Sequence, residues 1–145
     1  MMIQPVELHI YALDQWYIVP QKIAENGFLV EVSPVFVVEM DAVEQLAQAL
    51  VEARNISASL DQHASWDGEQ GRVWKAAKCF WTVAFLEDGS IEIDQSVRDM
   101  DENNGGLSWQ VQDEEPLRLP RGSREEDVVT ELLRQRSRDD QLTSS

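Results

Sequence analysis

Short runs of β-branched and aromatic residues, separated by turn-forming residues, dominate the first 40 positions of the chain. Four such runs precede the first helical pattern: residues 6–13, 16–19, 28–32 and 35–40. The first run begins by alternating apolar and polar side chains, which is the period of a strand with one buried face. Asn26-Gly27 predicts a tight turn, and the second run is expected to end at Pro20 because proline cannot donate to a sheet ladder. This order predicts a sheet.

Two later segments have the periodicity of amphipathic helices. The first follows Asp41, which is expected to cap it together with Glu44, and should end near Arg54-Asn55. Its apolar stripe is predicted to be Val43, Leu46, Ala47, Leu50 and Val51. The second follows Ser123, with Glu126 completing an S-x-x-E capping box. Its predicted stripe is Val128, Val129, Leu132 and Leu133.

Between these helices the chain returns to strand-like patterns. Residues 73–86 are apolar and aromatic, with an alternative helical turn at 73–77, and Trp74 and Trp81 in this run are expected in the core. The turn sequence Glu87-Asp88-Gly89-Ser90 predicts a hairpin to residues 91–97. An acidic loop is expected at 98–106 and a further strand at 107–112. Residues after 112 carry no predicted strand.

The resulting order predicts one α+β domain with a largely antiparallel sheet and two main amphipathic helices. A chain of 145 residues suits a single domain, which is expected to span residues 1–137. Residues 138–145 are predicted to form a polar tail that frays.

The formal net charge of −15 is concentrated in two regions. Residues 1–71 carry 11 acidic and 2 basic side chains, and residues 98–117 carry 6 and 1. A field this negative repels nucleic acid and anionic lipid, so neither is expected as a partner. A basic protein is the complementary partner, although acidity also serves solubility alone. A hydrophobic content of 43% with five Trp indicates a folded body.

The sequence favours a cytoplasmic location without membrane attachment. The N-terminal residues lack the basic and apolar regions of a signal peptide, and no apolar run is long enough to span a bilayer. Cys79 is the single cysteine, so an intrachain disulfide is impossible. A buried, inert thiol is expected there; the alternative is a nucleophile activated by Lys75 or Lys78.

Motifs for catalysis or metal binding are missing from the sequence. The run that starts at Asp99 resembles a calcium loop, but Asn104 and Gln110 stand where such a loop needs glycine and a bidentate glutamate. His9 and His63 have no partner at a metal-ligand spacing, and His9 is expected on a strand. We therefore expect no metal, no cofactor and no enzymatic activity.

Partner-binding residues are expected where a tryptophan lies beside carboxylates, because aromatic anchors with an acidic rim suit a basic partner. The first group is Trp66, Asp67 and Glu69. The second is Asp99, Asp101, Glu102, Trp109, Asp113, Glu114 and Glu115.

Three segments carry a family resemblance: S-P-V-F-V-V before the first helix, W-K-A-A-K-C-F-W-T-V, and L-P-R-G-S-R-E-E-D-V-V at the last helix. With the order of elements, they resemble small immunity proteins encoded beside bacterial contact-dependent or polymorphic toxins. The resemblance implies a cytoplasmic protein that binds and blocks a cognate toxin domain, often a nuclease. A basic nuclease surface would meet the carboxylates of this chain.

Two other function classes stay open from the sequence. One is a small hydrolase or transferase that uses His63 with an aspartate, which requires a pocket where the two side chains meet. The other is a structural adaptor or oligomer subunit whose apolar strands pair across a two-fold axis. The sequence leaves the oligomeric state undecided.

Overall fold

The computed structural model describes residues 6–23, 28–59, 72–73, 76–77, 79–99, 108–111 and 117–143. Within these ranges it does not describe the side chains of residues 29, 79, 97–99, 108–111 and 137–143. Cys79 is therefore placed on a strand, while its thiol, like Trp74 and His63, lies outside the description.

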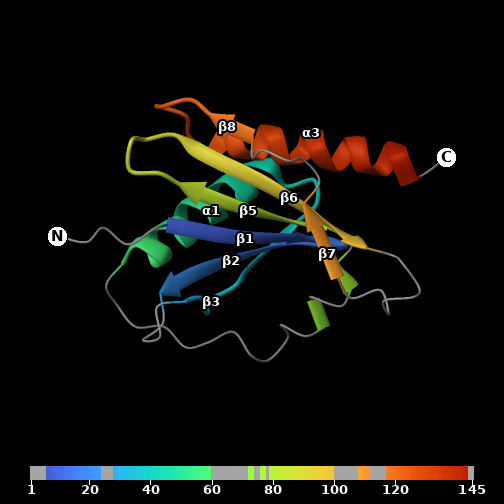
Figure 1. Ribbon diagram of the computed structural model, residues 1–145, viewed down its shortest axis with the longest axis horizontal. Coiled ribbons are helices and arrows are strands. Elements are labelled where there is room, and N and C mark those ends of the chain that lie inside the picture. Colours follow the sequence, from blue (N-terminus) through green and yellow to red (C-terminus); the bar gives the residue numbers. More distant parts are fainter. Residues whose placement is uncertain are drawn as a thin grey trace.

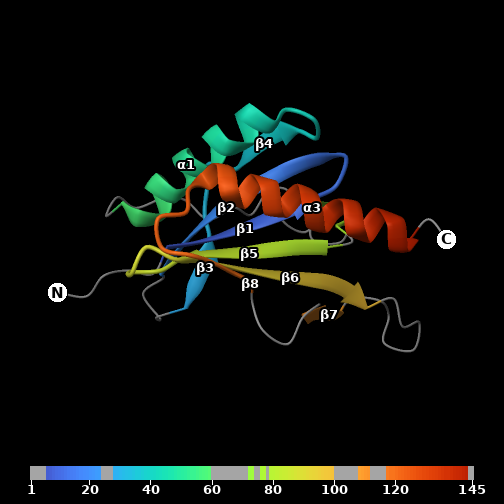
Figure 2. The same cartoon turned by 90° about the horizontal axis from the view of Figure 1, so that it is seen from above.

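The described strands form one sheet in which every pairing is antiparallel. They are β1 (Val6–Ala12), β2 (Gln15–Ile23), β3 (Leu29–Glu31), β4 (Phe36–Glu39), β5 (Cys79–Phe85), β6 (Ile91–Asp99), β7 (Ser108–Val111) and β8 (Leu117–Leu119). The order across the sheet is β3-β2-β1-β5-β6-β7, with β4 also paired to β2 and β8 to β6. The helices α1 (Val43–Ala58) and α3 (Glu125–Thr143) lie on one side of the sheet (Figure 1, Figure 2). The predicted α+β class is confirmed.

Pro20 does not end the second strand, contrary to the sequence prediction, because β2 continues to Ile23. The Pro20 carbonyl accepts a hydrogen bond from the Val32 amide at 3.0 Å. The N and C=O of one residue in an antiparallel strand face the same neighbour. The Pro20 nitrogen therefore faces the junction between β3 and β4 and not β1. Its lack of a hydrogen costs the pairing of β1 with β2 no hydrogen bond.

The first helix starts one residue later than predicted. Its N-cap is Ala42, with no capping side chain, and Asp41 instead accepts a hydrogen bond from the Val43 amide through its backbone carbonyl. The helix also runs beyond Arg54-Asn55 to Ala58. Its buried residues are Leu46, Ala49, Leu50, Ala53 and Ser57. Val43, predicted in the stripe, is 45% exposed, so the buried face is rotated from the predicted one.

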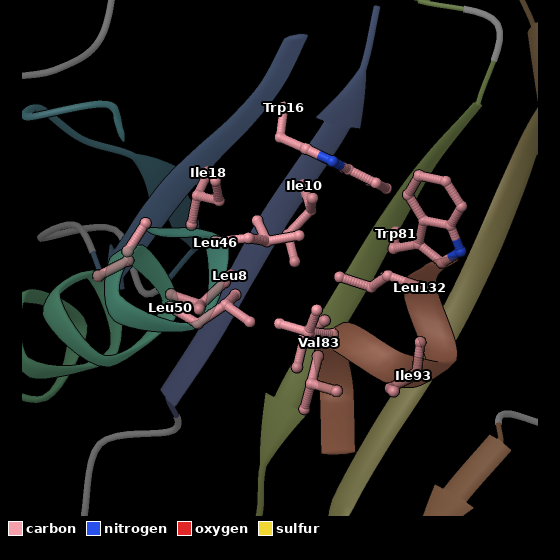
Figure 3. Packing of buried hydrophobic residues seen from close by; sticks show 14 of the residues in the cluster. Leu8, Ile10, Trp16, Ile18, Leu46, Leu50, Trp81, Val83, Ile93 and Leu132 are labelled. Atoms are coloured by element: carbon pink, nitrogen blue, oxygen red, sulfur yellow. The ribbon is translucent and has the colours of Figure 1, made fainter. Parts of the chain in front are cut away.

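The main core lies between the sheet and both helices. Figure 3 shows its side chains converging from four strands and two helices: Leu8, Ile10, Trp16, Ile18, Leu46, Leu50, Trp81, Val83, Ile93 and Leu132. Trp81 is fully buried, as predicted, and its ring centroid lies 5.6 Å from that of Trp16. The Trp81 indole donates a hydrogen bond to the Gln135 side chain at 2.8 Å. A smaller cluster, built on Tyr11, Tyr17, Val19, Val73 and Ala77, covers part of the other face.

The predicted hairpin between β5 and β6 is confirmed. The Asp88 carboxylate accepts hydrogen bonds from both the amide and the hydroxyl of Ser90, which hold the pKa of Asp88 below its usual value. Gly89 has φ +91°, which glycine adopts without strain. The Ala77 amide donates to the Val73 carbonyl at 2.9 Å, which is the spacing of the helical turn considered for residues 73–77, although residues 74 and 75 lie outside the description.

The last helix begins one residue after its predicted start. Arg124 precedes the helix, and its amide donates to the Asp127 carboxylate at 2.8 Å. Asp127 thus makes the side-chain hydrogen bond back to the start of the helix that was predicted for Glu126. The turn that precedes the helix is closed by a hydrogen bond from the Ser123 amide to the Pro120 carbonyl. The predicted stripe is largely correct, because Val128, Val129 and Leu132 are buried and Leu133 is partly buried. The helix extends to Thr143, into the segment predicted as a tail.

Two further strand predictions need correction. Arg98 and Asp99 belong to β6 and not to a loop, since they pair with Trp109 and Ser108 of β7. The strand β8 was not predicted, because a three-residue strand shows too little alternation to be recognised. It pairs with the start of β6, and its Leu117 and Leu119 pack against the main core.

Candidate partner-binding groove

An open groove of about 370 Å³ lies between β4 and one flank of α1. Its lining residues are Val35, Phe36, Val37, Val38, Gln45, Gln48, Ala49 and Glu52. Gln45, Gln48 and Glu52 recur at spacings of three and four residues, so they share one face of the helix. We refer to this feature as the β4–α1 groove.

Contacts at both ends of α1 fix the helix against the sheet and thereby set the width of the groove. Before the helix, the Trp16 indole donates to the Met40 carbonyl at 3.4 Å. At its end, the Ser57 hydroxyl donates to the Gln21 carbonyl at 2.7 Å. The Lys22 ammonium donates to the carbonyl and the hydroxyl of Ser59, and a cation there also suits the negative end of the helix dipole. The groove is therefore built on anchored elements.

The strand β4 is an edge of the sheet, because no other described strand pairs with its outer side. Even-numbered residues of β2 direct their backbone groups toward β4, as the Pro20 carbonyl shows. Phe36 and Val38, which oppose Ile18 and Trp16, therefore bond to β2. The N–H and C=O of Val37 face the opposite way, toward the outer edge.

The segment that forms the groove is acidic, and one of its carboxylates, that of Glu52, lines the groove. Residues 35–52 contain four acidic side chains and no basic one. The four are Glu39, Asp41, Glu44 and Glu52, and all are exposed. The nearby Gln15 amide donates to Glu39 at 3.0 Å, which leaves the carboxylate charge in place. The sequence prediction missed this cluster because Asp41 and Glu44 were assigned to helix capping; the absence of Lys and Arg over 18 positions was the available signal.

The structure describes few of the residues predicted to bind a partner, and it tests none of them as a contact. Asp99 and Trp109 lie on the neighbouring strands β6 and β7, at the edge of the sheet opposite β4, and only their backbones are described. The remaining predicted residues lie outside the described ranges: Trp66, Asp67, Glu69, Asp101, Glu102, Asp113, Glu114 and Glu115. They stay predictions.

His9 lies on β1, as expected, on the face of the sheet away from the helices. Its Nδ1 is 2.9 Å from the Glu31 carboxylate, and the Tyr11 hydroxyl donates to the same oxygen at 2.7 Å. Burial, and then the charge of Glu31, raises the pKa of Tyr11, so the phenol stays protonated as a donor. The Phe80 ring lies 5.2 Å from the imidazole and 5.3 Å from the phenol ring. These contacts tie the three-residue strand β3 to β1.

A carboxylate that holds an imidazole is also part of general-base sites. The Thr82 residue of β5 opposes His9 in register, but no hydrogen bond links the two in the described structure. The described residues include no group of three or more side chains suited to a metal ion. None of the described helices is both long and apolar enough to cross a bilayer. The β4–α1 groove is the better candidate site, because it is an open groove in a segment of exposed carboxylates.

No protein-family model and no curated protein matches the chain. The candidate site accordingly rests on the geometry and charge described above.

Replacing Asp94 with asparagine is expected to raise the melting temperature at pH 7. Partial burial, and then the charge of Glu92 two positions earlier, raises the pKa of Asp94. A raised pKa means that the ionised form is less favourable in the folded than in the unfolded protein. The stabilisation by Asp94→Asn should therefore shrink as the pH falls, and disappear below the ordinary aspartate pKa of about 4. Thermal unfolding monitored by circular dichroism across this range measures it.

Glu87→Gln is the matched control, because it removes the same charge from an exposed turn. This control should leave the melting temperature nearly unchanged, both at pH 7 and below the ordinary aspartate pKa. An equal gain from both variants would mean that total charge, and not the surroundings of Asp94, sets the effect.

Proposed function

We propose that this chain is a non-catalytic acidic protein that binds a basic protein partner, and that it acts as an immunity protein blocking a cognate toxin domain in the bacterial cytoplasm. The resemblance of its sequence segments to small immunity proteins suggests the toxin. The observation that supports a basic partner is the set of four exposed carboxylates, with no basic residue, in the segment 35–52 that forms the β4–α1 groove, within a chain of net charge −15.

Physical chemistry favours this pairing. A nuclease needs a positively charged surface for phosphate contacts. Carboxylates that cover such a surface exclude the nucleic acid and also steer the two proteins together, which accelerates association. An inhibitor that must act before its toxin causes damage benefits from this speed.

A co-expression survival assay tests the proposal. The chain is expressed together with the product of the reading frame immediately upstream of its gene. Rescue of growth from a toxic neighbour is the expected result. A toxic neighbour that kills equally with and without this protein would contradict the immunity function.

Charge reversal at the groove is expected to slow association with the rescued partner by about tenfold and to flatten its salt dependence. The variant is Glu39→Lys with Glu52→Lys, which places one change on each of the two elements that form the groove. Stopped-flow mixing at several salt concentrations measures the rates. The control is Glu87→Lys with Glu126→Lys, an equal change of charge at exposed positions outside β4 and α1.

A third variant reverses the charges of Asp113, Glu114 and Glu115, which the sequence predicts as part of the interface. If it slows association and the groove variant does not, the acidic segment that contains Asp113, Glu114 and Glu115 is the binding surface. If all three variants behave like the unmodified protein, charge steering by either surface is excluded.

A further inference from the structure

The proposed basic partner has one clear route into the β4–α1 groove. We propose that a basic, extended polypeptide segment binds there by adding a strand to the outer edge of β4. This inference rests on the proposed function, since it specifies how the partner is held. It requires an available edge, space beside that edge, and charge that selects the occupant.

The edge is available at Val37. Its N–H and C=O face away from β2, and its side chain is 50% exposed. No described residue forms a backbone bond to Val37 on this side. An incoming strand would satisfy both groups, and main-chain hydrogen bonds are the source of affinity in strand addition.

The space beside the edge has the right shape and lining. The groove runs along β4, with residues 35–38 on one wall and the Gln45, Gln48 and Glu52 flank of α1 on the other. An added strand presents alternate side chains to the two sides of the sheet. Those directed toward the helix would meet side-chain amides and a carboxylate, which suit lysine or arginine.

Charge argues against a second copy of this chain as the occupant. Pairing two β4 edges would bring together two sets of the carboxylates Glu39, Asp41, Glu44 and Glu52, on two proteins of charge −15 each. Like charges placed close together across an interface oppose association. A segment rich in lysine or arginine gains from the same carboxylates, so it is the favoured occupant.

The test uses a fluorescent peptide of alternating lysine and valine, with binding followed by fluorescence anisotropy. A second peptide carries an N-methyl group on every residue, which removes the donors along both edges and keeps the charge. We expect at least tenfold weaker binding of the methylated peptide, and little binding of a glutamate–valine peptide. Equal binding of the methylated and unmethylated peptides would overturn strand addition.

Val37→Pro tests the same contact from the protein side. Proline removes the outward N–H, and on an edge strand it spares the ladder to β2. We expect at least a tenfold loss of affinity for the lysine–valine peptide, whereas Val37→Thr, which keeps the backbone donor, should bind like the unmodified protein. Circular dichroism tests whether both variants fold. If Val37→Pro does not fold, the comparison of the methylated and unmethylated peptides alone tests strand addition.

The outcomes separate this inference from the proposed function. Rescue in the survival assay without any preference for the unmethylated peptide overturns strand addition and leaves the immunity function standing. Peptide binding that depends on Val37, in the absence of rescue, would support strand addition at β4 and contradict the immunity function. A dimer that Val37→Pro converts to a monomer in analytical ultracentrifugation would show that another copy occupies the edge, which overturns the inference.

Discussion

Replacing Trp81 with alanine is expected to lower the free energy of unfolding by about 3–5 kcal/mol, a large part of the stability of a domain this size. The side chain is fully buried, packs against Trp16 and donates to Gln135. Alanine would leave a cavity and also deprive the buried Gln135 amide oxygen of its donor. Urea unfolding followed by circular dichroism measures the loss.

Trp81→Phe separates packing from hydrogen bonding in the same experiment. Phenylalanine keeps much of the ring contact but cannot donate to Gln135, so a smaller loss is expected. Adding Gln135→Leu should recover part of that loss, because both polar partners are then removed. A loss below about 1 kcal/mol for Trp81→Ala would contradict the packing described here.

Leu132→Ala is expected to cost about 2–5 kcal/mol, because Leu132 is fully buried where α3 meets the sheet. The same unfolding measurement applies. This result would establish that α3 is an integral part of the core and not an appended helix.

Leu133→Ala provides the matched control. It is the same substitution one position along, where the side chain is only partly buried. Its cost should be clearly smaller than that of Leu132→Ala. Equal costs would place the buried face of α3 elsewhere than between Val128, Val129 and Leu132.

The sequence predicted the fold well where one face of an element is buried and the other is polar. The β5–β6 hairpin is an example, because alternation and the turn chemistry of Asp88 and Gly89 agree. The sequence prediction was wrong where a local preference was identified correctly but packing against other strands or helices determined the structure. Pro20 lacks a donor in every context, yet it lies inside β2 because the missing donor faces a junction between two short strands.

Helix starts show the same limit. Ser123 and Asp41 are good capping residues, yet both helices begin one residue later than these residues predicted. A preference for capping is worth only about 1 kcal/mol, so packing of the helix against the sheet overrides it. The buried stripe of α1 likewise follows the position of the sheet, which leaves Val43 half exposed.

The groove could not be predicted because its two walls are separate elements that only the fold brings together. Their sequence signal is the absence of basic residues between positions 35 and 52, and it says nothing about a free strand edge. The edge became visible once the register of β4 on β2 showed which way Val37 directs its backbone.

The division of this sheet edge into two short strands also bears on how the protein behaves when crowded. A long, continuous apolar edge allows one sheet to continue into the next molecule and to grow into fibrils. Here that edge is divided into β3 and β4, of three and four residues. Neither piece offers a long unbroken template on which a row of molecules could extend the sheet. The short strands of this edge therefore disfavour growth into fibrils, even though the outer side of β4 is open in the described structure.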